Sequence, residues 1–341
     1  MPLPQPPAHR PGNAGVRGCC RQTDRVRQVC SWYRGLISGA AHYNLALPVG
    51  CECVMTRLAC ILFFSTLSVL SLPSAAAVHV VASTTPLAMI ASAATPGDTD
   101  LQVLMTPALA SPEFRLGERE LKLLEEAELV VWTGPDAEPW LADAPAAPRE
   151  GRQLITLSKL PGVTWRDYRL DAKDAGKHGA NPHLWLSTQN AAVLARAVGA
   201  HLGNAPAAEH FAAEMQRFRN RQQARFQPVA ALGVIAADDA FGYLFAEMGV
   251  INVTALTAVA GVNVSAQRVE DLAERVRRED IACVIGPPGF EQGPAAQLLP
   301  GGHGHLVTLD PMLGGIPLAR DSYTLALIQL ADTLYGCIVT R

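Results

Sequence analysis

The sequence predicts an α/β fold in which two four-stranded parallel-sheet lobes are joined by a long interdomain helix. Short β-branched runs alternate with amphipathic helical segments from residue 78 onward. One stretch of some forty residues, 188–227, has helical patterning and no strand. The chain has 341 residues, 49% of them hydrophobic and 17% charged, which is enough for two domains of ordinary size.

The first lobe and the second lobe each contain four predicted strands. Those of the first lobe are residues 78–82, 101–105, 129–133 and 154–157. Those of the second lobe are residues 232–236, 251–256, 281–285 and 306–309. Amphipathic segments such as 118–127, 266–278 and 321–335 supply helices between the strands. Such alternation is typical of parallel sheets with helices on both faces.

The middle of the chain predicts two consecutive helices, separated by the Gly-Asn-Ala-Pro sequence at 203–206. The second, at 207–227, is polar over much of its surface, as expected for a rod between two lobes. We therefore assign residues 78–205 to an N-terminal lobe, 206–228 to a linking helix and 229–341 to a C-terminal lobe. Two such lobes leave a cleft beyond the carboxyl ends of their strands, where ligands of open α/β sheets bind.

Residues 55–77 have the pattern of a secretory signal peptide. A short basic start at 55–57 precedes an apolar stretch at 58–72, and small residues near Ala77 provide a cleavage site. Residues 1–54 form a Pro- and Arg-rich N-terminal extension, which we expect to be unstructured or non-native. Cleavage after Ala77 would leave 264 residues of the 341.

Removal of the leader makes the remaining chain acidic. The leader holds seven Arg and two acidic residues, so 21 basic and 29 acidic side chains remain, a net charge of −8. An acidic protein without a basic stripe is a poor ligand for nucleic acid or anionic lipid. No nucleophile elbow, phosphate loop or His-Glu-x-x-His sequence occurs in the chain, so we expect a binding protein and not an enzyme.

Only two cysteines, Cys283 and Cys337, remain after the predicted cleavage. An even pair in an exported chain indicates one disulfide; two separately buried thiols are the alternative.

Four segments place a polar, metal-binding side chain beside a predicted strand or helix. Ser111-Pro112-Glu113 follows the second strand, and Asn181-Pro182-His183 precedes the middle helices. Asp238-Asp239 follows the first strand of the second lobe, and Asp310-Pro311 follows its last. Taken singly, each residue is also explained as a helix cap or a turn.

The amino-acid sequences of several segments, and their order along the chain, resemble those of the periplasmic zinc-binding proteins of ABC importers. These proteins form the ZnuA-like branch (cluster A-I type) of the zinc and manganese solute-binding family. The segments are 129–141 (LVVWTGPDAEPWL), 181–187 (NPHLWLS), 239–245 (DAFGYLF), 308–314 (TLDPMLG) and 321–337. The sequences around Cys283 and Cys337 also resemble those of that branch's disulfide. The resemblance implies a periplasmic protein that binds one divalent transition-metal ion and delivers it to an inner-membrane ABC permease. We expect it to act as a monomer.

The resemblance implies four metal ligands at Glu113, His183, Asp238 and Asp310. Family members usually have His at the first two of these positions, His (or Glu in manganese-type members) at the third and Asp at the fourth, so only His183 and Asp310 agree. Carboxylates suit manganese or iron(II) better than zinc, which favours nitrogen and sulfur donors. Three ionised acids, one neutral imidazole and a divalent ion leave a net charge of −1, which is costly to bury. The ion is therefore expected to be zinc, manganese or iron.

Two other functions are consistent with these departures. One is a diverged family member that no longer binds free metal and instead carries a metal chelate or assists another transporter. The other is a secreted metallohydrolase in which Glu113 or Asp239 acts as a general base beside the metal.

Overall fold

The computed structural model describes residues 77–109, 114–142, 152–171, 179–258, 263–278, 281–290, 298–299 and 305–340. Predictions on residues 1–76, and on Glu113, lie outside these ranges. The first half of the described chain alternates strands with helices. Its elements are β1 (His79–Thr84), α3 (Thr85–Ser92), β2 (Asp100–Met105), α4 (Glu118–Glu126), β3 (Leu129–Trp132), α5 (Pro139–Ala142) and β4 (Gln153–Thr156).

The first four strands form one parallel sheet in the order β2-β1-β3-β4. Its side chains alternate between two buried faces. Val80 and Ala82 of β1 pack with α3, whereas Val81 packs with Leu124 of α4 on the other face. Because α3 leads from β1 to β2 and α4 leads back to β3, the strand order reverses between β1 and β3, and polar groups after these two strands face a crevice.

A second parallel sheet has the equivalent order β6-β5-β7-β8. Its elements are β5 (Gly233–Ala236), α8 (Gly242–Met248), β6 (Val253–Ala255), α9 (Ala266–Arg278), β7 (Ile281–Gly286), β8 (His305–Thr308) and α11 (Ser322–Val339). Ile235 and Val284 pack with Leu272 of α9, and the opposite face of the sheet packs with α11. The predicted α/β class with two four-stranded parallel sheets is confirmed.

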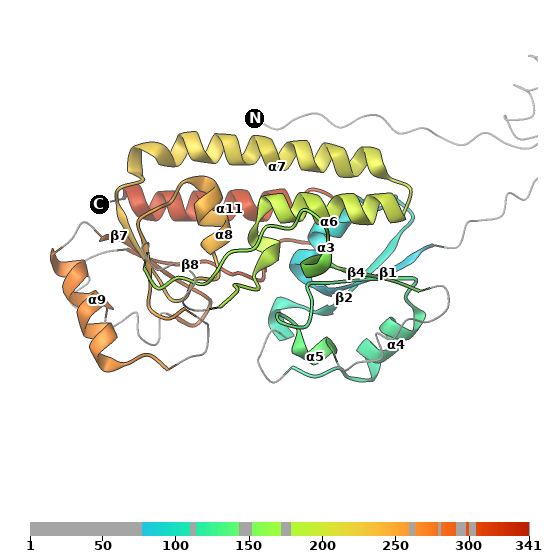
Figure 1. Ribbon diagram of the computed structural model, residues 1–341, viewed down its shortest axis with the longest axis horizontal. Helices are drawn as coiled ribbons and strands as arrows, with labels where there is room; N and C mark the ends of the chain where they lie inside the picture. Colours follow the sequence, from blue (N-terminus) through green and yellow to red (C-terminus); the bar gives the residue numbers. More distant parts are fainter. Residues whose placement is uncertain are drawn as a thin grey trace, which may run out of the picture. The chain divides into compact units, whose positions relative to one another are not determined.

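Two helices separate the sheets in sequence: α6 (Thr188–His201) and α7 (Ala205–Phe226). The second corresponds to the predicted linking helix. It runs alongside α6 and α11, whereas α4, α5 and α9 lie on the opposite side of the sheets (Figure 1). Its buried positions, which include Phe211, Met215 and Phe218, face the core at helical spacing.

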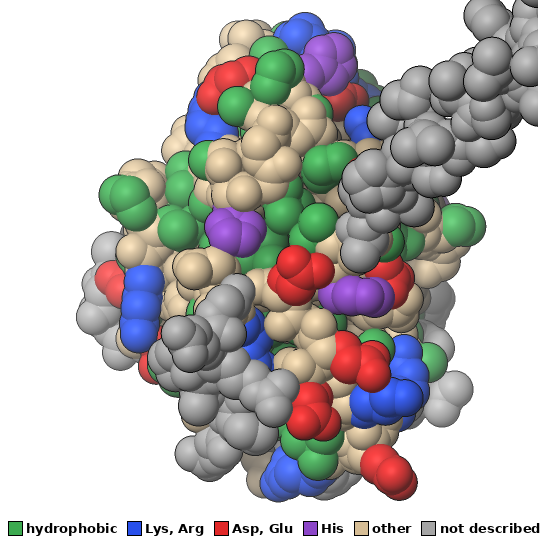
Figure 2. All heavy atoms as spheres, turned by 90° about the vertical axis from the view of Figure 1, so that its right-hand side faces the viewer, with side chains coloured by type: hydrophobic (Ala, Val, Ile, Leu, Met, Phe, Trp, Pro, Cys, Tyr) green, Lys and Arg blue, Asp and Glu red, His purple; other side chains and the backbone are tan. Residues whose placement is uncertain are grey.

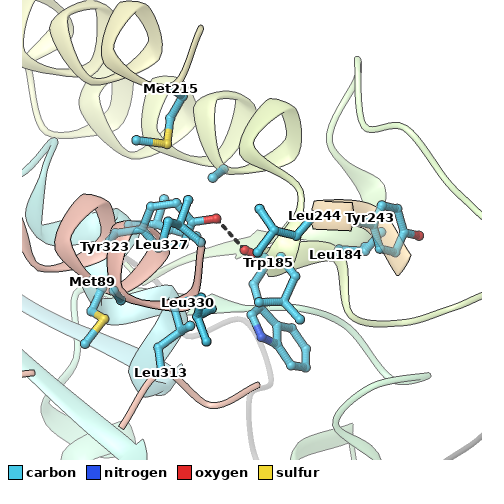
Figure 3. Packing of buried hydrophobic residues seen from close by; sticks show 14 of the residues in the cluster. Met89, Leu184, Trp185, Met215, Tyr243, Leu244, Leu313, Tyr323, Leu327 and Leu330 are labelled. Atoms are coloured by element: carbon cyan, nitrogen blue, oxygen red, sulfur yellow. Dashed lines mark hydrogen bonds between the residues drawn. The ribbon is translucent and has the colours of Figure 1, made fainter. Parts of the chain in front are cut away.

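The hydrophobic core is continuous from one sheet to the other. A single cluster contains Val80 of β1 and Ile285 of β7 as well as Phe211 of α7 and Tyr323 of α11. Within it the Tyr323 hydroxyl donates a 2.6 Å hydrogen bond to the carbonyl oxygen of Trp185 (Figure 3). Shared packing of this kind holds the two lobes together and limits their relative movement.

A peptide segment, residues 163–171, crosses from the first lobe onto the second; we call it the strap. Its Arg169 N–H donates to Asp239 Oδ2 at 2.9 Å, and its Leu170 carbonyl accepts from Ala255 N–H at 2.7 Å. Asp171 at its end lies 3.7 Å from Arg268 and 3.6 Å from Arg275, both in α9. The strap thus fixes the loop after β5 against the first lobe.

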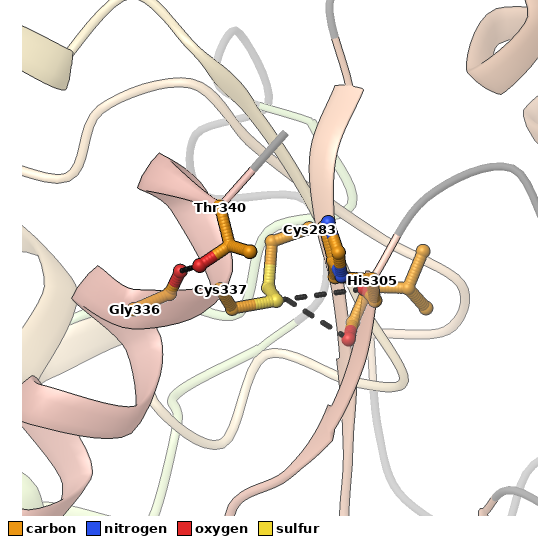
Figure 4. Close-up of a disulfide and its surroundings, with 6 residues drawn as sticks. Cys283, His305, Gly336, Cys337 and Thr340 are labelled. Carbon is orange, nitrogen blue, oxygen red and sulfur yellow. Dashed lines mark hydrogen bonds between the residues drawn. A yellow bond between two sulfur atoms is a disulfide. The ribbon is translucent and has the colours of Figure 1, made fainter.

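The predicted disulfide between Cys283 and Cys337 is present, with the two Cα atoms 5.5 Å apart (Figure 4). It joins the buried strand β7 to the last turn of α11. Both residues are buried, so the bond cross-links the core of the second lobe and closes a loop of 54 residues.

Helix α11 is long and apolar enough to cross a membrane by length and composition alone. However, 56% of that stretch is buried inside the protein, including Tyr323, Leu327 and Leu334. Its hydropathy is therefore explained by its place in the core.

Acidic and basic side chains are interspersed on the face shown in Figure 2. The described residues of that face form no continuous basic surface.

Candidate metal centre

Asp238 lies directly beyond the carboxyl end of β5, where the strand order of the second sheet reverses. Its Oδ1 accepts a 2.8 Å hydrogen bond from Ala240 N–H, which closes a tight turn before α8. Burial raises the pKa of its carboxyl above the usual range. A small pocket of about 10 Å³ opens beside it, lined also by Ile285, Gly286 and Pro311. This is close to the space that one water-sized particle needs.

Asp310 lies in the loop after β8 and is held by backbone donors. Its Oδ1 accepts from Met312 N–H at 2.8 Å, and its Oδ2 accepts from Gly314 N–H at 2.9 Å. A Cβ at Gly314 would stand 2.6 Å from Asp310 Oδ2, so only glycine permits this approach. Because each carboxylate oxygen has a second lone pair, the group can still bind a cation while the loop holds it in place.

His183 follows the sequence Asn181-Pro182 and precedes a short 3-10 turn, Leu184–Leu186. Its Nδ1 lies 2.8 Å from Asn181 Oδ1, and its backbone N–H donates to the same oxygen at 3.0 Å. Since Asn181 Oδ1 can only accept, Nδ1 must hold the ring proton, which leaves the Nε2 lone pair available for a metal ion. Burial lowers the pKa of His183 to about 4, so the imidazole is neutral at pH 7.

Two hydrogen bonds tie the His183 segment to the loops of both aspartates. The Asn181 side-chain N–H donates to the Asp239 carbonyl oxygen at 2.7 Å, next to Asp238. The Trp185 Nε1–H donates to the Pro311 carbonyl oxygen at 2.9 Å, next to Asp310. The structure thereby brings together the segments of three of the four expected ligands. Among the described residues, however, no three His, Cys, Asp or Glu side chains lie close enough together to hold a metal ion.

Asn181 is the site residue whose role the sequence analysis missed. It is fully buried, and its side chain bonds to both His183 and Asp239. The Tyr243 hydroxyl also donates to its carbonyl oxygen at 2.8 Å. Its spacing of two residues before the histidine was the available signal, because Asn often bonds to a group two residues further on.

We expect Asn181→Ala to weaken metal binding by about 10- to 100-fold, because the imidazole would lose the partner that fixes its tautomer. Asn181→Asp keeps an acceptor for His183 Nδ1–H and should retain more affinity than Asn181→Ala. Metal titration of both variants checks this order. Equal losses in the two variants, or no loss in either, would contradict a positioning role for the Asn181 oxygen.

Glu138 is a buried carboxyl in the first lobe. It follows β3, near the place where the strand order of the first sheet reverses. Glu138 is 1% exposed and accepts from Thr133 N–H at 3.2 Å, while its Oε1 has no hydrogen-bond partner among the described residues. The nearby strand ends contribute the buried hydroxyls of Ser83, Thr84 and Thr133. Burial raises the pKa of Glu138 to about 7.

Glu138 should make stability depend on pH. Between its ordinary pKa of 4.5 and its folded pKa of about 7, the folded state keeps a proton that the unfolded state loses. The free energy of unfolding therefore falls as pH rises through this window. We expect Glu138→Gln, which resembles the protonated acid, to be more stable than the parent at pH 8 by up to about 3 kcal/mol and similar at pH 4.5.

Urea unfolding at both pH values measures this difference. Asp136→Asn is the matched control, because Asp136 is exposed and two residues away. A Glu138→Gln variant that gains no more at pH 8 than this control would show that Glu138 ionises normally in the folded protein.

Glu247 of α8 holds the beginning of α6. Its Oε1 accepts from the Ser187 hydroxyl at 2.6 Å, and its Oε2 accepts from Thr188 N–H at 2.9 Å. A carboxylate is favoured at a helix N-terminus, so this contact between elements of the two lobes is stabilising. It also supports the chain immediately after His183.

Comparisons with known proteins agree with this architecture. Residues 80–337, about three quarters of the chain, match the family described as "Zinc-uptake complex component A periplasmic". The high-affinity zinc uptake system protein ZnuA of Yersinia pestis is 27% identical over 293 residues, covering 77% of this chain and 92% of that protein. The protein of the same name from Haemophilus ducreyi is 24% identical, covering 80% and 97%.

Solved structures share the fold. A crystal structure of ZnuA superposes with a TM-score of 0.63 at 22% identity, covering 77% of this chain and 99% of that one. The laminin-binding protein of Streptococcus agalactiae superposes with a TM-score of 0.64 at 17% identity, covering 76% and 98%. The family match extends over both sheets, the linking helix and both cysteines. The chain belongs to the periplasmic zinc-uptake complex component A family.

Proposed function

We propose that the chain is exported, captures one divalent transition-metal ion in the periplasm and delivers it to an inner-membrane ABC permease. The main observation in support is the neutral His183, whose Nε2 is left free while hydrogen bonds tie its segment to the loops of Asp238 and Asp310. Such an arrangement suits reversible capture of a cargo ion, which needs no bond to be broken. Glu113 is the fourth proposed ligand.

Zinc is the first candidate for the cargo, because the relatives from Yersinia pestis and Haemophilus ducreyi are named for zinc uptake. The proposed donors, one imidazole and three carboxylates, favour manganese or iron(II) more than a His-rich site does. Affinity alone does not select the ion in the cell, because geometry and metal availability also matter.

Competitive titration of the metal-free exported protein with Zn(II), Mn(II) and Fe(II) tests the proposal. We expect one equivalent of metal to bind, with loss of binding in variants of His183 and Asp310. The order of the three affinities then shows which ion the site itself prefers. If no ion binds at a defined stoichiometry, the capture of free metal is wrong.

A second candidate function is transport of a metal chelate by a diverged family member. It is favoured by Glu113 and Asp238, which replace expected histidines. Stoichiometric binding of free metal by all four proposed ligands would exclude this alternative. Saturable binding of a chelate, but not of the free ion, would support it.

The proposed route begins with cleavage after Ala77, which gives a mature chain starting at Val78. N-terminal sequencing of the exported protein checks this boundary, and a start well away from Val78 would refute it. We further propose that the mature protein meets its permease as a monomer. Light scattering at micromolar concentration checks this, and a stable dimer would contradict it.

A further inference from the structure

A polar pocket of about 360 Å³ lies between the strap, the first turn of α6, one face of α7 and helix α8. We call it the Arg166 pocket. Its volume falls in the range of small-molecule sites. None of the four expected metal ligands lines it, so the proposed metal cargo does not account for it.

Arg166 enters this pocket from the strap. Its backbone N–H donates to the Tyr243 hydroxyl at 3.0 Å, which fixes the position of the residue. Its guanidinium, in contrast, makes no hydrogen bond or ion pair with any residue that the structure describes, and the carboxylates of Asp239 and Glu247 attract it only from a longer distance. Partial burial, together with the charge of Arg169, lowers the pKa of Arg166. Burial and Arg169 thus outweigh the attraction of Asp239 and Glu247. A partly desolvated cation that lacks a hydrogen-bonded partner is unfavourable, and a bound anion would relieve this.

The α7 wall of the pocket consists of polar side chains at helical spacing: Gln216, Arg219, Asn220 and Gln223. Arg219 is held in place because its Nη1 donates to the Thr188 hydroxyl at 2.7 Å. Its Nη2 donates to Gln216 Oε1, and Gln216 Nε2 donates to Asn220 Oδ1 at 2.8 Å. This wall therefore provides a second guanidinium, held within a hydrogen-bonded row of polar side chains.

Glu247 is the acidic residue among those lining the pocket, and its oxygens already accept hydrogen bonds from Ser187 and Thr188. Two guanidinium groups thus face one carboxylate that has other partners. Among the lining residues two positive charges therefore stand against one negative charge, and the carboxylate of Asp239, which does not line the pocket, also attracts Arg166.

We propose that the Arg166 pocket binds a small organic anion with carboxylate groups. Arginine presents paired N–H donors that match a carboxylate, and guanidinium groups from two walls suit a ligand with more than one acidic group. The volume exceeds what a single inorganic oxyanion fills, and polar side chains of α7 line the remaining space. The proposal does not depend on the identity of the transported metal.

Calorimetric titration of the metal-free exported protein with succinate and with citrate tests the proposal. We expect at least one of them to bind saturably with one equivalent, and Arg166→Gln to weaken this binding by about tenfold or more. The control is Arg221→Gln, which removes an exposed arginine of α7 that does not line the pocket and should leave binding unchanged. Gln216→Glu, at an exposed position of the lining face, should weaken binding by placing a carboxylate beside Arg219.

Succinamide and inorganic phosphate distinguish the chemistry of the ligand. The uncharged diamide should not bind, and phosphate should bind more weakly than the better carboxylate. The proposal is overturned if neither carboxylate binds, if succinamide or phosphate binds equally well, or if folded Arg166→Gln and Gln216→Glu both keep the parent affinity. Because metal is absent throughout, these outcomes are independent of the metal titrations above.

Discussion

His183→Ala is expected to abolish specific metal binding, with a loss of affinity of more than about 100-fold. The variant removes the one nitrogen donor among the four proposed ligands. It also removes the ring that bonds to Asn181 beside the proposed metal centre. The remaining three carboxylates would have to hold the ion without a neutral ligand, which concentrates negative charge in a partly buried place.

His201→Ala is the matched control for this experiment, because His201 is exposed in the last turn of α6. Isothermal titration of both variants with the ion preferred by the parent gives the comparison. Unchanged affinity in His183→Ala would place the metal site elsewhere in the chain. A similar loss in His201→Ala would indicate a general effect on folding.

Loss of the Cys283–Cys337 disulfide is expected to lower the free energy of unfolding by about 4 kcal/mol. The bond closes a loop of 54 residues, so its removal gives the unfolded chain more conformational freedom. It also ties β7 to α11, which together cover much of the second lobe's core. We therefore expect the second lobe to open first when the bond is reduced.

Urea unfolding of the parent and of the double variant Cys283→Ala/Cys337→Ala measures this effect. Dithiothreitol should destabilise the parent and leave the double variant unchanged, which serves as the internal control. Two free thiols in the exported protein under non-reducing mass spectrometry would contradict the disulfide. A parent that is equally stable with and without dithiothreitol would contradict its stabilising role.

The sequence predicted the strand content well because each strand is short, β-branched and bounded by helical patterns. All eight predicted strands appear, with ends that differ by a few residues, and the two parallel sheets follow from their alternation with helices. Helix α3 shows where prediction from the helical spacing of hydrophobic residues fails. Seven of its eight residues are buried, so Thr85–Ser92 has no polar face to mark it as a helix.

The candidate site was less accessible to sequence reasoning, because its geometry depends on contacts between distant segments. Nothing local to Asn181 indicates that its side chain bonds to Asp239, or that Trp185 reaches Pro311. The strap and the Arg166 pocket likewise exist only once the two lobes are packed together. The order of the motifs identified His183, Asp238 and Asp310 as candidates. Their hydrogen-bond partners could be identified only from the folded structure.

Elemental analysis of the protein purified from its own periplasm tests the central claim most directly. We expect about one equivalent of a transition metal per chain, removable by a chelator and absent from His183→Ala prepared in the same way. Parent protein that contains no metal, and that takes up none when zinc, manganese or iron(II) is added, would contradict the proposal that this chain captures a free metal ion.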